Sequence, residues 1–391
     1  MTHYIRYFTG IALIFASASA LATVSHVFVS NNGDKTMSVL ECVTSNGSKP
    51  ITCKERERID ASQINVNSSW PANQYQGHPA WWWTGLSGQI VGLKAKTRAT
   101  PLLKDKNRVY VDTYTIPGRP DSGSNFIGIM PDGRTAWNAA REVDQIQEID
   151  TDPDSPTFGT ILISLHVPDQ YPPTGENETR GAARPCDATI SPDGRYFFEP
   201  DLWGESMTVV DTQQKSIIHQ VIPPRLNTEE IVSPFMATTN GDIVLVENFE
   251  DGGTYDVWDV SVLPNEPVHI KKLSRDNDGL GLAPLTSEFT PDGKHAYLIM
   301  NGLDSEDAPP ALASRLDVLD VIPESSTYLE IVKSIELPTN CGAHTGDFSS
   351  DGRYFFVNCS RADSVAVVDN DTLETLFAIP VGDEPRGIVV R

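Results

Sequence analysis

Hydrophobic and polar residues alternate in short runs along most of the chain. The runs at 353–358 and 363–370 place apolar side chains at every second position, which predicts strands that bury at least one face. Between Cys341 and Gly382, four such segments follow one another with tight turns between them. The Asp351-Gly352 pair at the first turn supplies the positive φ that a two-residue hairpin requires. We therefore expect a unit of four short antiparallel strands.

This unit repeats along the chain. Its most regular part is the third strand, an alternating run usually closed by Asp or Thr. The run occurs at 36–41, 89–94, 145–150, 206–212, 255–261, 314–321 and 363–370. The turn between the first and second strands recurs as Pro131-Asp-Gly, Pro192-Asp-Gly, Asn240-Gly-Asp, Pro291-Asp-Gly and Ser350-Asp-Gly. Seven units of roughly 53 residues predict an all-β fold, a seven-bladed β-propeller of four-stranded antiparallel blades.

The two ends of the chain are expected to meet in one blade. Residues 26–41 resemble the second and third strands of a unit without its first, and 385–390 begin a further copy that stops. Pairing of the C-terminal strand with the N-terminal blade closes the ring and leaves no open edge within it. The second unit is the irregular one, and we place its first strand near 64–70.

The first 22 residues have a different pattern. Arg6 precedes an apolar run that ends in Ala20-Leu-Ala22, which is typical of a cleaved secretory signal peptide. The run is too short to span a membrane, and no later segment is long and apolar enough to do so. We therefore divide the chain into a signal peptide, 1–22, and a propeller, 23–391, located in the periplasm or at the cell surface.

Export makes disulfides possible, because they persist in an oxidising compartment. Cys42 and Cys53 flank the turn between two strands of the first unit, and Cys341 and Cys359 flank a strand pair of the last. Each pair is a candidate disulfide between neighbouring strands. Cys186 is left over.

The composition is strongly acidic, with a formal net charge of −23. Nucleic acid and anionic lipid surfaces would be repelled by this charge, so a small molecule or a protein is the expected partner. A closed propeller is expected to be stable as a monomer.

One family resembles this repeat. Its units show Pro-x-Gly, an apolar-Ser-Pro-Asp-Gly-Arg/Lys turn as at 190–195, an aromatic-rich strand, the strand Ser364-Val-Ala-Val-Val-Asp and the segment Ile379-Pro-Val-Gly. The pattern is similar to the YVTN-type β-propeller repeat of cytochrome d1-like and lactonase-like seven-bladed propellers. It is clearest over 123–391. The resemblance implies the fold, whereas the activities of such propellers differ, so function has to be argued from the site.

One position of the repeat is a candidate ligand site. The residue after the repeat's Pro position begins the first strand, which lines the central channel, and it differs in every unit. These residues are Asn125, Cys186, Phe235, Leu285, His344 and Arg386. Variation at one ring of positions in an otherwise regular scaffold is what the binding of an asymmetric ligand would require. Alternatively, the channel mouth is polar and varied only because this keeps the protein soluble.

Within that ring, Cys186 and His344 carry the most reactive side chains. A thiolate and an imidazole can hold a soft transition metal or act as nucleophile and base, yet the two lie in different units with nothing to enforce proximity. A buried thiol and a hydrogen-bonded histidine are the alternative. His344 is also the candidate axial ligand for a haem d1-type cofactor, and the chain has no Cys-x-x-Cys-His for covalent haem.

Two further stretches carry candidate binding residues. Trp81, Trp82 and Trp83 follow one another, and on a strand at least one indole would face solvent or an interface, where a ligand or partner could stack. Packing between blades is the alternative. In 150–154 three Asp residues alternate, as in calcium loops, although Asp150 also occupies a regular turn of the repeat.

The sequence therefore leaves three functions open. The first is an exported, non-catalytic propeller that binds a small ligand or a partner protein at the channel mouth. The second is a lactonase-like hydrolase in which His344, Arg386 and Asn125 polarise an ester carbonyl and activate water. The third is channel handling of a metal or haem d1, resting on Cys186 and His344. No cofactor is required by the sequence.

Overall fold

A computed structural model of the chain describes residues 23–44, 51–60, 81–86, 89–95, 109–115, 124–152, 155–169, 182–226, 232–249, 253–303, 309 and 312–390. In the three strands between 81 and 115 the description covers the backbone and not the side chains. The described residues are almost entirely strand. They include one short α-helix, α1 (Arg275–Asp278), and one 3₁₀ turn, η2 (Arg141–Val143).

The strands form seven antiparallel sheets within the described ranges. The first sheet has the order β27 (Pro385–Val390), β1 (Thr23–Asn31), β2 (Thr36–Thr44), β3 (Thr52–Asp60). A three-stranded sheet follows, with β4 (Trp81–Leu86), β5 (Gln89–Ala95), β6 (Val109–Thr115). The third sheet has β7 (Ser124–Ile129), β8 (Thr135–Ala140), β9 (Gln145–Asp150), β10 (Ile161–His166), and the fourth has β11 (Thr189–Ile190), β12 (Tyr196–Asp201), β13 (Ser206–Asp211), β14 (Ser216–Val221).

Three more four-stranded sheets complete the set. The fifth contains β15 (Pro234–Thr239), β16 (Ile243–Asn248), β17 (Thr254–Asp259), β18 (Val268–Leu273). The sixth contains β19 (Pro284–Phe289), β20 (His295–Met300), β21 (Arg315–Asp320), β22 (Ile331–Glu336). The seventh contains β23 (Ala343–Phe348), β24 (Tyr354–Cys359), β25 (Ser364–Asp369), β26 (Glu374–Pro380). All seven expected third-strand runs coincide with strands, which confirms the repeat.

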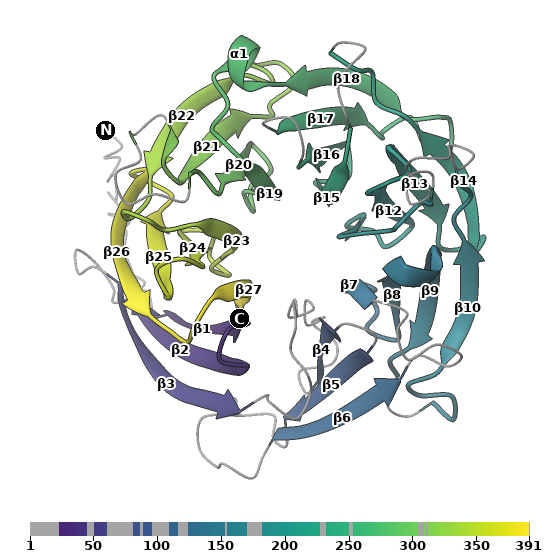
Figure 1. Ribbon diagram of the computed structural model, residues 1–391, viewed down its shortest axis with the longest axis horizontal. Helices are drawn as coiled ribbons and strands as arrows, with labels where there is room; N and C mark the ends of the chain where they lie inside the picture. Colours follow the sequence, from purple (N-terminus) through teal and green to yellow (C-terminus); the bar gives the residue numbers. More distant parts are fainter. Residues whose placement is uncertain are drawn as a thin grey trace, which may run out of the picture.

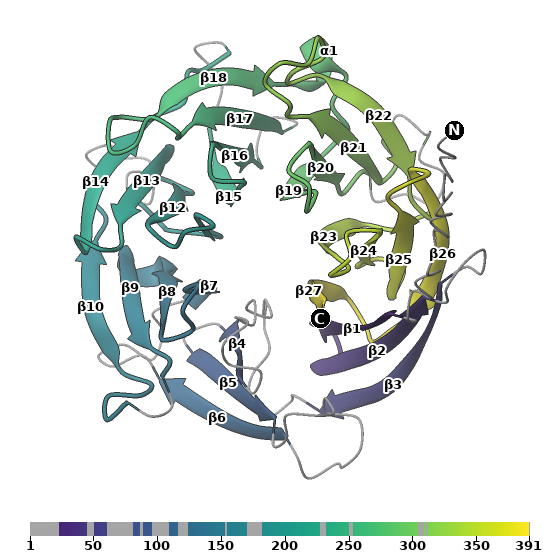
Figure 2. The same cartoon turned by 180° about the vertical axis from the view of Figure 1, so that it is seen from behind.

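The sheets stand around a central axis as the blades of a β-propeller (Figure 1), and the view from behind shows the same ring (Figure 2). The first strand of each complete sheet lies nearest the axis and the fourth lies on the rim. β27 pairs with β1 from Val27 to Asn31, so the C-terminal strand joins the N-terminal blade as expected. In the described part of the chain, no helix is long and apolar enough to cross a membrane.

The second blade is the incomplete one. β5 coincides with the expected third-strand run at 89–94, and it pairs with β4 on one side and with β6 on the other. β4 therefore occupies the place of a second strand. The predicted first strand, near 64–70, lies outside the described residues.

The Asp-Gly turns adopt one conformation, and they are longer than the two-residue hairpin that we expected. In the first of them, the N–H of Met130 donates to the carbonyl of Thr135, and the N–H of Gly133 donates to the carbonyl of Met130. The carboxylate of Asp132 accepts the N–H of Arg134 at 2.9 Å. A loop of this length can be closed by a type I turn followed by one residue in the left-handed conformation. Here that residue is Gly133, whose φ is 71°.

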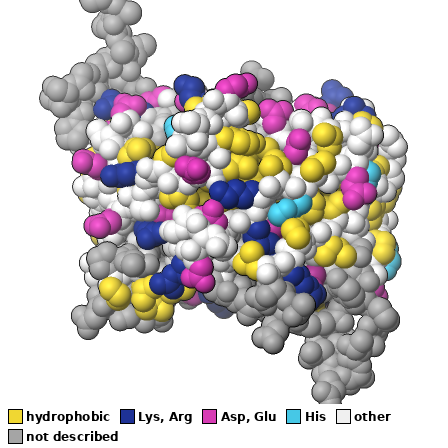
Figure 3. All heavy atoms as spheres, turned by 90° about the horizontal axis from the view of Figure 1, so that it is seen from above, with side chains coloured by type: hydrophobic (Ala, Val, Ile, Leu, Met, Phe, Trp, Pro, Cys, Tyr) yellow, Lys and Arg dark blue, Asp and Glu magenta, His cyan; other side chains and the backbone are white. Residues whose placement is uncertain are grey.

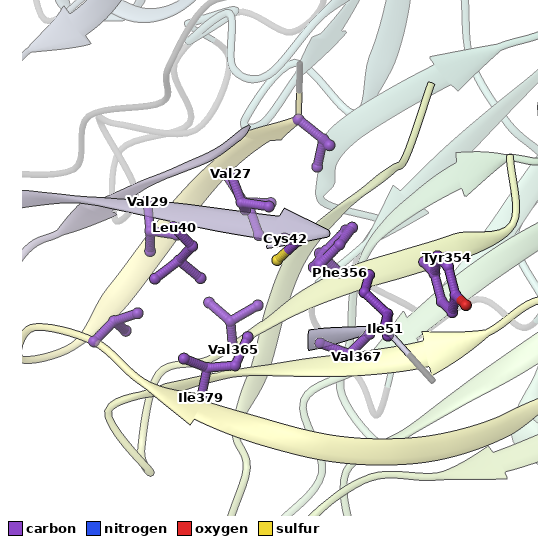
Figure 4. Close-up of a cluster of buried hydrophobic side chains, with 13 residues drawn as sticks. Val27, Val29, Leu40, Cys42, Ile51, Tyr354, Phe356, Val365, Val367 and Ile379 are labelled. Atoms are coloured by element: carbon purple, nitrogen blue, oxygen red, sulfur yellow. The ribbon is translucent and has the colours of Figure 1, made fainter. Parts of the chain in front are cut away.

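Packing between neighbouring blades supplies the core. Figure 4 shows the cluster that joins the first and last blades, where Val27 and Leu40 face Phe356 and Val367. These side chains are fully buried. The cluster thus ties strands from the two ends of the sequence together, and Ile388 and Val390 of β27 belong to it.

The rim is mixed in character. Hydrophobic side chains appear there among acidic and basic ones (Figure 3). The outermost strands expose Leu162, Val268, Ile270, Val332 and Leu376.

Both predicted disulfides are present, Cys42–Cys53 between β2 and β3 and Cys341–Cys359 across the start of the last blade.

Each innermost strand carries a β-bulge at the same place. In β15, for example, Pro234 pairs with Asn248 and Met236 pairs with Glu247, so that Phe235 is an extra residue. The same one-residue shift occurs in the other innermost strands of the six four-stranded sheets, at Asn125, Leu285, Arg386, in the segment 344–345, and between Pro185 and Thr189. Bulges redirect side chains and often lie beside functional sites. The ring of variable residues is therefore a ring of bulges.

Candidate functional site

The innermost strands enclose a cavity of about 420 Å³ on the propeller axis, a size that suits a small ligand. Its walls come from β7, β11, β15, β19, β23 and β27, and it extends to the turns at Pro131 and Pro192. Its polar side chains are three carboxyls and a set of hydroxyls. They are Asp187, Glu288, Asp347, Thr189, Ser191, Thr238, Thr286, Ser287 and Thr345. Among the described residues, no Lys, Arg or His lines it.

Two of the carboxyls belong to neighbouring blades. Glu288 lies three residues after the bulge of β19, and Asp347 lies three residues after His344 in β23. β19 and β23 are adjacent around the axis, so the shared register brings the two side chains to the same level of the channel. Burial, together with the charge of Asp347, raises the pKa of Glu288 well above its usual range.

The surroundings of Asp347 favour its charged form. Its Oδ2 accepts the N–H of Val390 at 2.7 Å, and its Oδ1 accepts the N–H of Phe348 at 2.8 Å. Backbone donors of this kind stabilise a carboxylate relative to the acid. The raised pKa makes Glu288 the more readily protonated member of the pair. A cavity with one carboxylic acid and one carboxylate can supply a proton to a ligand and accept another from water.

Asp187 stands on a different wall of the cavity, in the fourth blade. Its backbone is fixed because its N–H donates to the carbonyl of Phe235 at 3.0 Å and its carbonyl accepts the N–H of Ala237 at 2.9 Å. Behind it lie Glu199 and Glu247, both buried. Burial, reinforced by neighbouring carboxylates that include Asp187, raises the pKa of both glutamates well above the usual range.

His344 and Arg386 are brought together at the bulges of the last and first blades. Burial, together with the charge of Arg386, lowers the pKa of His344 to about 3, although a hydrogen bond to the backbone of Arg386 opposes this shift. The imidazole is therefore neutral at physiological pH. The guanidinium of Arg386 pairs with Glu384, and neither His344 nor Arg386 lines the cavity. Their proposed part in catalysis stays a prediction.

Cys186 is separate from His344. The groups that affect its thiol are Asp187, Arg141 and Glu199, whereas His344 is affected by Arg386. Cys186 is outside both disulfides and fully buried, and this burial raises the pKa of its thiol well above the usual range. A joint role of the two as metal ligands, or as a nucleophile and its base, stays a prediction.

This burial predicts a simple result for thiol titration. We expect the native protein not to react with an aromatic disulfide reagent over minutes, because the thiolate is the reactive form and the thiol is both protonated and shielded. In denaturant without reductant, we expect one thiol per chain. Rapid reaction of the native protein, or more than one thiol after unfolding, would contradict the structure.

The remaining candidates of the ring have different positions. Phe235 stacks on Phe249 with ring centroids 5.6 Å apart, and Phe249 is half exposed. Leu285 is buried. The side chains of Asn125, Trp81, Trp82 and Trp83 lie outside the described residues, so their roles in ligand binding stay predictions.

Asp150, the first carboxylate of the candidate calcium loop, stabilises a turn of the repeat. Asp150 accepts hydrogen bonds from the hydroxyls of Ser155 and Thr157 and from the N–H of Asp152. Asp320 makes the same contacts with Ser325 and Thr327 in another blade. The carboxylate thus closes a loop of the repeat. Asp154 lies outside the described residues.

A metal ion and a haem each require particular side chains as ligands or partners. Within the described ranges, no group of three or more His, Cys, Asp or Glu side chains is arranged to hold a metal ion. A haem would bring carboxylates of its own, and the described lining of the cavity offers carboxylates and no cationic side chain to receive them. The described cavity residues therefore offer no cationic partner for the carboxylates of a haem d1-type group.

Glu288, Asp347 and Asp187 were missed by sequence reasoning. A usable signal existed for the first, since Glu288 stands between Ser287 and Phe289 in a strand that is otherwise uncharged. A carboxyl in a core strand is costly unless it is paired or functional. The signal becomes specific only when the register of two blades is known.

Comparisons with known proteins support the fold. No family model matches the chain, and no curated protein matches it. Among solved structures, the periplasmic gluconolactonase of Pseudomonas aeruginosa is similar, with a TM-score of 0.67 and 14% identity over 94% of this chain and 99% of that one. A 6-phosphogluconolactonase candidate from Bacteroides uniformis gives a TM-score of 0.69 and 15% identity over 94% and 99%.

A third similar structure comes from haem chemistry. A dihydro-haem d1 dehydrogenase gives a TM-score of 0.55 and 16% identity, over 93% of this chain and 74% of that one. At such identities these likenesses establish the propeller fold and not the activity. The resemblance to lactonase-like and cytochrome d1-like propellers is thus confirmed for the fold. Membership of the YVTN repeat family stays a prediction.

Proposed function

We propose that this protein is an exported hydrolase that opens the ring of a small lactone in its channel cavity, with Glu288 and Asp347 as the acid and base. The observation that carries the proposal is the pair of adjacent carboxyls inside a cavity of suitable size. The shared fold with a gluconolactonase supports it. The pair also leads us to prefer catalysis over a purely binding role for the channel.

The reaction follows from the two protonation states. Asp347 accepts a proton from a water molecule as the water oxygen attacks the lactone carbonyl carbon. Glu288 gives its proton to the ring oxygen as the bond between that oxygen and the carbonyl carbon breaks. The product is a hydroxy acid. The proton now on Asp347 passes to the neighbouring Glu288, which restores the starting state.

Two features of the cavity fit this chemistry. The hydroxyls of Thr189 and Thr238 lie on the walls of the fourth and fifth blades, where they can hydrogen-bond to a polyhydroxylated ring. The product carries a new carboxylate, and the described lining of the cavity offers it carboxyls and no basic side chain. Product release is therefore favoured.

Activity should depend on pH through both groups. We expect the purified protein to hydrolyse an uncharged sugar lactone, with a bell-shaped profile of kcat/KM. Since the pKa of Glu288 is raised well above its usual range, activity is lost as pH rises through that raised value. Protonation of Asp347 causes the loss at low pH. The profile is measured by titrating the acid released, after subtraction of spontaneous hydrolysis.

The result has clear alternatives. Absence of turnover with a panel of five- and six-membered lactones, together with saturable binding of one of them, would replace the proposal by a non-catalytic binding module. A rate that rises monotonically with pH would indicate hydroxide attack without Glu288.

Export is the second part of the proposal. The apolar leader that ends in Ala20-Leu-Ala22 motivates it, and the two disulfides are compatible with an oxidising compartment. The periplasmic location of a structurally similar gluconolactonase adds support. The N-terminal sequence of protein recovered from the periplasm, beginning at Thr23, tests it directly.

A further inference from the structure

The side of the cavity that faces the acid–base pair is apolar. Glu288 and Asp347 lie on the sixth and seventh blades, and the third blade stands across the channel from them (Figure 1). β7 of the third blade contributes four residues to the lining, and none of the four has a polar side chain. They are Phe126, Ile127, Gly128 and Ile129. The cavity therefore has a polar side, where the proposed reaction takes place, and an apolar side that the reaction leaves unused.

One position of the repeat has a different character on the two sides. Gly128 lies three residues after the bulge of β7, as Glu288 and Asp347 lie three residues after the bulges of their own strands. A Cβ added at Gly128 would lie 2.8 Å from Cδ1 of Ile190 and 2.9 Å from the ring of Phe126. Glycine thus lets these two side chains close over the backbone. Phe126, Gly128 and Ile190 together form the apolar wall, which spans the third and fourth blades.

The apolar wall is anchored in the core and open toward the axis. Phe126 packs on Phe197, with ring centroids 6.3 Å apart, and Phe126 and Ile190 both pack on the core between the third and fourth blades. Neither side chain is fully buried, and both line the cavity. Contact with an apolar group of a ligand would remove both surfaces from water, which favours binding.

We propose that the substrate is a lactone that carries an alkyl chain, which lies against the apolar wall while the carbonyl lies at Glu288 and Asp347. This inference rests on the proposed lactone hydrolysis for the place of the carbonyl. Pockets for drug-sized ligands measure roughly 300–1,000 Å³, and the cavity, at about 420 Å³, has room for a ring and a short chain. The hydroxyls of Thr286 and Ser287, beside Glu288, serve the polar ring.

Hydrolysis of a homologous series of γ-lactones by the mature protein tests the chain. The members from γ-valerolactone to γ-octalactone differ only in the length of the alkyl chain on one ring carbon, so their carbonyl groups have the same intrinsic reactivity. We expect kcat/KM to rise roughly two- to fourfold per added methylene, up to the factor for moving one CH₂ out of water. A constant or falling kcat/KM along the series would overturn the inference without any variant being needed.

A substitution then tests the apolar wall. Ile190→Thr shortens the side chain and adds a hydroxyl. We expect it to lower the ratio of kcat/KM between γ-octalactone and γ-valerolactone by about tenfold, the lower end of what one group of a hydrophobic pocket contributes to selectivity. Ile270→Thr makes the same change on the exposed strand β18 at the rim and should keep the ratio. If Ile190→Thr folds and retains the ratio, the chain does not lie against the wall and the proposal fails; if it does not fold, the series with the unchanged protein decides.

The two proposals can fail separately. The 5-alkyl-2-pyrrolidinones are lactams of the same shape that resist hydrolysis, so calorimetric titration with them measures binding alone. Hydrolysis of lactones with no dependence on chain length would sustain the proposed function and remove this inference. Affinity for the lactams that rises with chain length and depends on Ile190, in a protein that hydrolyses no lactone, would sustain the apolar subsite and remove the hydrolysis.

Discussion

Replacing Glu288 by glutamine is expected to lower kcat/KM for lactone hydrolysis by about 10² to 10⁴-fold, the usual contribution of a general acid. Glutamine keeps the size of the side chain but cannot release a proton to the departing ring oxygen. Asp347→Asn should have a similar effect because it removes the acceptor for the proton of water. The double variant should be little worse than either single one, since the two groups act as a unit.

The measurement is a steady-state rate compared with the rate of a matched variant. Glu324→Gln changes an exposed residue in the loop between β21 and β22 and should leave the rate unchanged. Ligand affinity should change far less than turnover in Glu288→Gln. Full activity in both Glu288→Gln and Asp347→Asn would place the chemistry elsewhere, and His344 and Arg386 would then be the residues to change.

Ending the chain after Glu384 is expected to prevent cooperative folding. This change removes β27, the innermost strand of the first blade, and leaves the edge of β1 from Val27 to Asn31 unpaired. It also removes Ile388 and Val390 from the core cluster that joins the first and last blades. Deleting one buried aliphatic side chain costs about 2–5 kcal/mol, so the loss of a whole strand approaches the total stability of a typical protein, about 5–15 kcal/mol.

Thermal unfolding followed by circular dichroism checks this result. Ile388→Ala provides a graded version, with an expected loss of about 2–4 kcal/mol. Arg386→Ala, on the same strand with a partly exposed side chain, is the control and should cost much less because exposed ion pairs contribute little. A truncated protein that melts at the wild-type temperature would show that ring closure does not stabilise the fold.

The architecture was predictable because its information is local and repeated. Alternation at 206–212 or 363–370 specifies a strand without reference to the rest of the chain, and β13 and β25 lie where expected. The pairing of 385–390 with the N-terminal strand followed from an incomplete repeat at each end, and both disulfides followed from cysteines that flank paired strands. The turn at Asp132-Gly133 shows the limit, since its length depends on hydrogen bonds that the residue types leave open.

The site was predictable only in part. The ring of variable positions coincides with the bulges, but its described side chains are not among those that line the cavity. The walls of the cavity are instead formed by residues one to three positions later, such as Thr286 and Glu288. The importance of Glu288 depends on Asp347, which is remote in sequence. No periodicity within one repeat reveals a contact between two of them.

The bulges also bear on how such a molecule changes during evolution. A bulge residue such as Phe235 is an insertion between two ladder partners, so no residue of the neighbouring strand pairs with its backbone. Substitution there leaves the pairing of Pro234 and Met236 intact. Each blade thus offers one position that mutation can explore at little cost to folding. New ligands can be acquired one blade at a time on a scaffold that stays constant.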